Sequence, residues 1–181
     1  YYIEMIDSPG EIDTDLIGVK RTSSFPHVLD TYERTGEVCW HVESRRKISI
    51  GFKLYHKSNK QIRCDERSLF PRSHSPKVAF QLCLTHASSG EKVEIDSLDD
   101  SGKHLEFPTE PNIVGAESIM SHGVVRFHMK RLCVYSSHTK MPKNDKFRFE
   151  VRCVHDSLVG YSEMRARSPE FYSVARIVYK K

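Results

Sequence analysis

Basic residues are the largest group in this sequence whose type and spacing could do chemistry. They cluster in stretches that are typical of connections between strands, near residues 45–47, 56–77, 140–146 and 165–167. Lysine and arginine neutralise phosphates, and arginine can also donate two hydrogen bonds to the edge of a guanine base. We therefore predict that the DNA-binding residues are Arg45, Arg46, Lys47, Lys57, Lys60, Arg63, Lys140, Lys143, Lys146, Arg165 and Arg167.

The segment 56–77 is the longest of these basic stretches. Its charged residues are Lys57, Lys60, Arg63, Arg67, Arg72 and Lys77, opposed only by Asp65 and Glu66. A connection of this length in a small domain usually has a function or is mobile. The alternative interpretation is a set of solvated charges scattered over the surface. The two interpretations differ in geometry, because a DNA-binding rim requires the basic connections to gather at one end of the domain.

Cysteine and histidine spacings suggest a second kind of chemistry. Cys83-x-x-His86 has a spacing that zinc accepts, and these two residues are the first ligands to test. The sequence contains no Cys-x-x-Cys, so buried reduced thiols and surface histidines are the favoured interpretation. We predict no cofactor.

Catalytic motifs are missing from the sequence. It has no Gly-x-Ser-x-Gly, no phosphate-binding P-loop and no His-Glu-x-x-His. His155-Asp156-Ser157 contains residue types of a nucleophilic triad, but a triad is recognised by geometry and not by adjacency. We predict that the protein is not an enzyme.

The elements that would position the basic stretches are strands. Phe147 to Cys153 alternates strictly between apolar and charged residues, and Ile48–Leu54, Val78–Thr85 and Val125–Met129 show the same period of two, which is typical of half-buried strands. The runs on either side of the polar break at 138–145 predict an antiparallel hairpin. The single tryptophan, Trp40, is expected to anchor the core, and a short helix is expected near 65–70.

The strand spacing predicts the fold class. Seven to nine strands with turn residues every 8–12 positions are typical of an antiparallel, immunoglobulin-like β-sandwich with long loops and at most short helices. We expect residues 1–35 to form an N-terminal arm, loosely packed and acidic, with a first strand, and residues 36–181 to form the sandwich domain. The chain of 181 residues is long enough for one such core.

Charge and cysteine usage suggest a location. The net charge is +4, and the five cysteines are an odd number that cannot pair completely. No Asn-x-Ser/Thr acceptor, 18-residue apolar run or secretory signal is present. These features favour a reducing compartment, and we predict the nucleus and no membrane partner.

Taken together, the Arg-rich connection at 45–47, the β-only core, the lysine-rich tip at 140–146 and the closing Ser168-Pro169-x-Phe171 strand ending in Lys180-Lys181 resemble the p53-like group of transcription factors. The resemblance covers the general plan of residues 36–181. It implies an immunoglobulin-like DNA-binding sandwich, as in Rel, STAT, Runt and p53 proteins, with arginines in a groove of double-stranded DNA and lysines on phosphates. It also implies that a homodimer would set the spacing of half-sites.

A protein-interaction sandwich is the competing prediction. An immunoglobulin-like or C2-like module would use an exposed sheet edge or an acidic loop and would bind no nucleic acid. Asp96, Asp99 and Asp100 could hold calcium in a C2-like module, although a solvated turn explains them more simply.

Overall fold

A computed structural model describes residues 1–6, 30–34, 37–43, 48–93, 113–129, 131–132 and 145–174. The smaller of two main sheets contains β1 (Tyr2–Met5), β4 (Ile48–Tyr55) and β8 (Val124–Met129) in the order β1-β4-β8, and both of its pairings are antiparallel. On its inward face, Ile50, Phe52 and Leu54 of β4 are completely buried. The alternation expected for this stretch is thus confirmed.

The larger sheet has the strand order β2-β3-β12-β10-β5-β7. A further strand, β11, pairs with β10 but is not part of this order. These strands are β2 (Asp30–Arg34), β3 (Glu37–Glu43), β5 (Ala79–His86), β7 (Glu117–Ile119), β10 (Phe147–Cys153), β11 (Arg165–Arg167) and β12 (Phe171–Val174). The pairing of β3 with β12 is parallel, whereas the other pairings in this sheet are antiparallel. A third, two-stranded sheet joins β6 (Ile113–Val114) and β9 (Arg131–Leu132).

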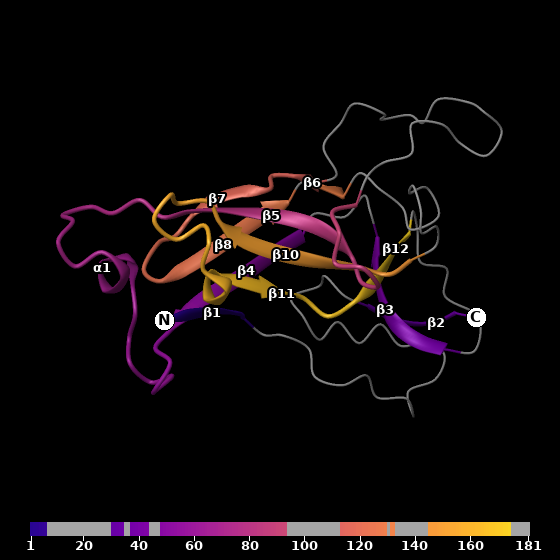
Figure 1. Cartoon of the computed structure of the whole chain (residues 1–181). Helices are drawn as coiled ribbons and strands as arrows, with labels where there is room; N and C mark the ends of the chain where they lie inside the picture. Colours follow the sequence, from indigo (N-terminus) through magenta and orange to yellow (C-terminus); the bar gives the residue numbers. More distant parts are fainter. Residues whose placement is uncertain are drawn as a thin grey trace.

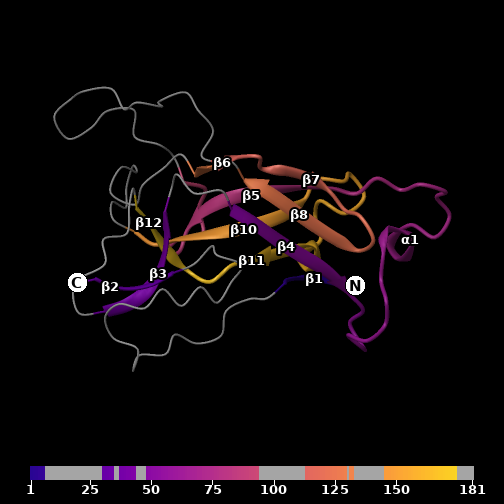
Figure 2. The ribbon, with the colours of Figure 1, turned by 180° about the vertical axis from the view of Figure 1, so that it is seen from behind.

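The two main sheets lie against each other, as both views of the molecule show (Figures 1 and 2). One core cluster combines residues of the smaller sheet, such as Phe52 and Phe127, with residues of the larger sheet, such as Phe80, Phe149 and Phe171. Burying these apolar side chains between the sheets is the main source of stability. The all-β, sandwich-like class is therefore confirmed.

The predicted hairpin between residues 123 and 155 is wrong. β8 pairs with β4 in the smaller sheet, and β10 pairs with β5, β11 and β12 in the larger one. Each strand has one apolar face, and the two apolar faces meet across the core instead of lying side by side. Alternation predicts which face of a strand is buried, but it does not predict the strand beside it.

Of the other expectations, the buried thiols, the tryptophan anchor and the short helix are confirmed, but surface histidines are wrong for His41 and His86, which are 1% and 3% exposed because strands β3 and β5 carry them into the interior. Trp40 is buried, and Cys64, Cys83 and Cys153 are buried free thiols. A short helix, α1 (Glu66–Leu69), lies where one was expected. The loose packing expected for the N-terminal arm is wrong for its first residues, because β1 buries Ile3 and Met5 in the core. The proposed boundary near residue 35 stays a prediction.

Candidate functional site

The predicted DNA-binding residues that the structure describes lie in three places. Lys57, Lys60 and Arg63 follow β4 at one end of the sandwich, where α1 lies in Figure 1. Lys146 precedes β10 at the opposite end, near β12. Arg165 and Arg167 lie on β11, along the edge of β10. The remaining predicted residues lie outside the described ranges: Arg45, Arg46, Lys47, Lys140 and Lys143.

Two lysines of the first place have carboxylate partners. Lys57 Nζ lies 2.8 Å from Glu163 Oε1, in the short 3-10 helix Ser162–Met164, and Lys60 Nζ lies 2.6 Å from Glu4 Oε2. The hydrogen bond from Lys57 lowers the pKa of Glu163 to about 2, and the hydrogen bond to Glu4 raises the pKa of Lys60. Both pairs are exposed, so they contribute little to stability, but each carboxylate competes with any phosphate for its lysine.

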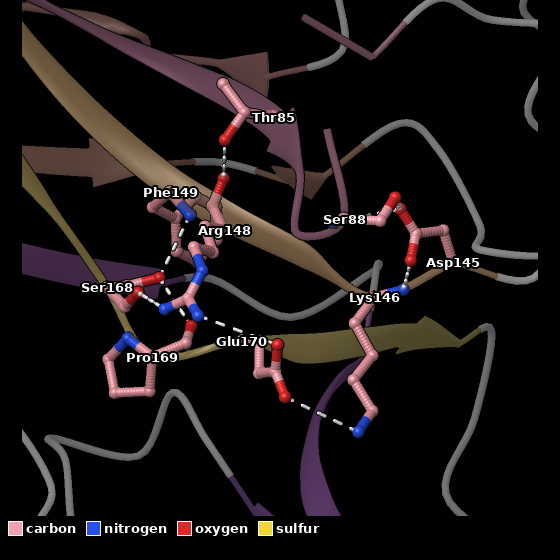
Figure 3. Close-up of polar contacts among 9 residues, drawn as sticks. All are labelled: Thr85, Ser88, Asp145, Lys146, Arg148, Phe149, Ser168, Pro169 and Glu170. Carbon is pink, nitrogen blue, oxygen red and sulfur yellow. Dashed lines mark hydrogen bonds and ion pairs between the residues drawn. The ribbon is translucent and has the colours of Figure 1, made fainter. Parts of the chain in front are cut away.

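At the opposite end of the sandwich, described cations also have a carboxylate partner (Figure 3). Glu170 Oε1 lies 3.5 Å from Lys146 Nζ, and Glu170 Oε2 lies 3.6 Å from Arg148 Nη2. The neighbouring carboxylate, Asp145, accepts a 2.6 Å hydrogen bond from Ser88 Oγ. Lys146 is thus separated from the other predicted cations and already has an anionic partner.

A buried serine secures this end of the larger sheet (Figure 3). Ser168 Oγ accepts the Phe149 N–H at 2.9 Å and donates to the Pro169 carbonyl at 2.8 Å, while its own carbonyl accepts from Arg148. With 1% of Ser168 exposed, no solvent replaces these bonds. The Ser168-Pro169 break therefore holds the turn from β11 to β12 against β10.

Residues 56–77, called the basic loop below, form a defined structure although only α1 is regular. Gly123, in the turn before β8, has a φ of +75°, and a β-carbon there would lie 2.0 Å from the Cys64 carbonyl oxygen. The ring of Phe70 lies 4.6 Å from that of His155, just beyond β10. Cys64 is buried beneath these contacts. The loop is thus fixed at both sheets.

The two acidic residues of the basic loop are used inside the fold. Asp65 caps α1, accepting the N–H groups of Arg67 at 2.9 Å and Ser68 at 3.2 Å. Glu66 Oε2 accepts the Gly123 N–H at 3.3 Å. These carboxylates therefore hold the backbone in place and form no ion pair with a cation of the loop.

Four cations of the basic loop remain uncompensated. They are exposed and form no ion pair with a carboxylate of the described residues: Arg63, Arg67, Arg72 and Lys77. Only Arg63 of these four was assigned to the site from the sequence. An aspartate before a short helical stretch could have indicated that Asp65 caps the helix and is not a partner for the cations of the loop.

The basic loop borders a pocket of about 410 Å³. Arg67, His74 and Lys77 line it from the loop, and Ser121 and His122 line it from the turn before β8. His122 has a φ of +51°, the one positive value among non-glycine residues that the structure describes, and Gly123 follows with +75°. Two successive positive φ values are required by a type I′ turn, which explains the hairpin into β8.

An unexpected carboxylate lies on the outer face of the larger sheet. The alternation in β10 correctly places Glu150 opposite the apolar residues, but only 1% of its side chain is exposed. Its two oxygens accept hydrogen bonds from Arg152 Nε at 2.5 Å and Arg167 Nε at 2.7 Å. Burial raises the pKa of this carboxyl, but the hydrogen bonds and charges of the two arginines outweigh burial, and the pKa lies below its usual value.

The zinc hypothesis depended on Cys83 and His86. The unbroken register with β10 puts Cys83 opposite Glu150 and His86 opposite Phe147, and residues three apart on a strand project from opposite faces. Within the described ranges, no group of three or more His, Cys, Asp or Glu residues is placed to hold a metal ion. Burial raises the pKa of the Cys83 and Cys153 thiols, which favours their unreactive, protonated form. The calcium hypothesis concerns Asp96, Asp99 and Asp100, which lie outside the described residues.

The part of the chain that the structure describes contains no helix long and apolar enough to cross a membrane. Comparison with known proteins identifies no relative: no family model, no curated protein and no solved structure matches the chain. The functional argument therefore depends on the residues of this chain alone.

Proposed function

We propose that this protein is a sequence-specific double-stranded DNA-binding domain of a transcription regulator, and that the basic loop is its main contact with the phosphate backbone. The observation that carries the proposal is a set of four exposed cations on one structured loop that pair with no carboxylate of the described ranges: Arg63, Arg67, Arg72 and Lys77. Cations held in place lose little freedom on binding, so their attraction for phosphates is retained.

The proposal differs from the sequence-based prediction in where the contact lies. Lys57 and Lys60 would have to exchange Glu163 and Glu4 for phosphates, and Lys146 lies at the other end of the sandwich. The interface we propose is therefore centred on Arg63, Arg67, Arg72 and Lys77. The arginines among them are suited to guanine edges, and the lysine to phosphate. A nuclear location would fit this function, and the p53-like resemblance stays a prediction.

Salt dependence provides the first test. Fluorescence anisotropy would measure binding of the full chain to a labelled 30-base-pair duplex at 50 and 200 mM salt. Four neutralised phosphates predict a slope of about −3.6 in a plot of log affinity against log salt, which is a loss of roughly 100-fold over this range. Binding that does not change with salt, or no binding to any duplex, would contradict the proposal.

A matched pair of charge reversals tests the location. Lys77→Glu lies in the basic loop, and Lys92→Glu makes the same change at the far end of β5, where an isolated bridge joins Lys92 to Thr85. We expect the first variant to weaken binding and flatten the salt slope by about 1, and the second to have a much smaller effect. Equal effects would mean diffuse attraction to a basic protein and no defined interface.

Sequence preference is measured separately by selecting bound duplexes from a randomised pool. Arg67→Lys keeps the charge but loses the planar pair of donors, so we expect it to relax the selected sequence at one or more guanines. The protein-interaction sandwich is the outcome if the chain binds no duplex. An exposed groove of about 700 Å³, lined by Ile119 of the edge strand β7 and by Val154, would then be the surface to study.

A further inference from the structure

Glu150 and its two arginines form the best-organised charged cluster on the outer face of the larger sheet. The carboxylate is 1% exposed, while the side chains of Arg152 and Arg167 are 37% and 59% exposed. A buried acid that carries two arginines on its solvent side differs from a surface ion pair, because the acid cannot rotate into water. The arrangement fixes the position of both guanidinium groups.

The hydrogen bonds of the cluster leave most donors of the arginines available. Both bonds to Glu150 use Nε, so the terminal nitrogens of Arg152 and Arg167 form no hydrogen bond with any residue in the described part of the chain. Arg165 lies in register with Arg152, is exposed and has no carboxylate partner among the described residues. Three arginines around one carboxylate leave two positive charges uncompensated, which is the charge that a phosphate group would neutralise.

We propose that Arg152, Arg165 and Arg167 form a phosphate-binding site, with Glu150 as the residue that positions Arg152 and Arg167. Cross-strand neighbours in a sheet are about 5 Å apart, a separation that lets two guanidinium groups donate to one phosphate. The planar guanidinium donors match the oxygens of a phosphate, which a lysine ammonium approaches only as a point charge.

If the phosphate belongs to DNA, this site extends the proposed DNA interface, and the inference then rests on the proposed function. Arg165 directly follows the 3-10 helix Ser162–Met164, and Glu163 of that helix binds Lys57 of the basic loop. The site and the loop therefore meet at the same end of β11. A nucleic-acid backbone that contacts the loop could continue across the outer face of β10 and β11.

Two probes separate a free phosphate compound from a DNA backbone. Inorganic pyrophosphate would be titrated into the full chain by calorimetry, and the labelled duplex would be titrated by anisotropy. Arg152→Lys/Arg167→Lys keeps the net charge and removes the paired planar donors. We expect this double variant to bind both probes roughly ten-fold more weakly, with an unchanged salt slope for the duplex. Arg126→Lys, on the outer face of β8, is the matched control and should bind as the wild type does.

The double variant could lose binding because it misfolds, so Arg165→Lys is a second test. Arg165 has no bond to Glu150, and its replacement should leave the fold intact. We expect this variant also to weaken pyrophosphate binding. The inference is overturned if both the double variant and Arg165→Lys bind pyrophosphate and duplex as tightly as the wild type does. If the wild type binds pyrophosphate in an arginine-dependent way but binds no duplex, the site stands and the proposed function fails. If duplex binding depends on Lys77, and neither duplex binding nor pyrophosphate binding depends on these arginines, the proposed function stands and this site does not exist.

Discussion

Replacing Glu150 by glutamine tests the strongest electrostatic claim about this fold. The side chain keeps its size and one acceptor oxygen, but it loses the charge that Arg152 and Arg167 share. Hydrogen bonds to charged groups contribute about 1.5–3 kcal/mol each when they are shielded. Because the two arginines are 37% and 59% exposed, water compensates part of this loss. We expect Glu150→Gln to lower the free energy of unfolding by about 2 kcal/mol, which corresponds to about 4–8 °C in Tm for a domain of this size.

The pH dependence of this loss identifies its origin. The pKa of Glu150 is lowered in the folded state, so its contribution is present above the unfolded-state pKa of about 4.3 and is lost as pH falls through the folded-state value. Urea unfolding of both proteins would therefore show a difference at pH 7 that shrinks below about pH 4.

Glu170→Gln is the control for the Glu150 substitution. The Glu170 side chain is 46% exposed and lies 3.5 Å and 3.6 Å from its two partners. We expect a change within about 0.5 kcal/mol. The reasoning would be refuted if Glu150→Gln were as stable as the wild type at pH 7. The free energy lost on burying the carboxylate would then equal the free energy gained from its bonds to the two arginines. A loss that does not vary with pH would assign the effect to shape and not to charge.

Three further predictions follow from single contacts. Gly123→Ala should destabilise the protein by at least about 2 kcal/mol and expose the basic loop to limited proteolysis, because a β-carbon would collide with the Cys64 carbonyl, whereas Gly160→Ala, with no atom within 4 Å, should be nearly neutral. Ser168→Ala should cost about 1–3 kcal/mol in urea unfolding by leaving the buried Phe149 N–H without a partner, and the exposed Ser162→Ala should cost little. Peptide mass spectrometry after iodoacetamide treatment should find Cys83 and Cys153 unmodified in the native protein and modified in urea; rapid native modification would contradict their burial and raised pKa values.

The positions of several strands and the apolar face of each could be predicted from the sequence. In β10, Phe147, Phe149 and Val151 are fully buried as the period of two requires, and the same agreement holds for β4. In β5 the expected apolar face is buried, but the strand is not half-buried, because Cys83 and Thr85 on the other face are buried as well. The pairing of strands could not be predicted in this way. β12 lies parallel to β3, far away in the chain, and β8 and β10 belong to different sheets. Such pairings depend on which apolar faces meet in the core, and the pattern within one strand carries no information about its neighbour.

The candidate site shows the same division. The excess of basic residues in the segment 56–77 was visible in the sequence, but the compensation of individual charges was not. Lys57 meets Glu163 and Lys60 meets Glu4, partners that are 106 and 56 residues away in the chain. The alternation of β10 placed Glu150 on the charged face of the strand, but it did not predict that Arg152 and Arg167, the second carried by β11, would both bond to a buried Glu150.

The sequence by itself determined that this protein is built from strands with one apolar and one polar face, and that its charge is unevenly distributed. Both are properties of residue types and their spacing along the chain. Only the tertiary structure decided which cations stay free, because an ion pair depends on distance through space and the folded sheets bring remote carboxylates to some lysines and arginines but not to others.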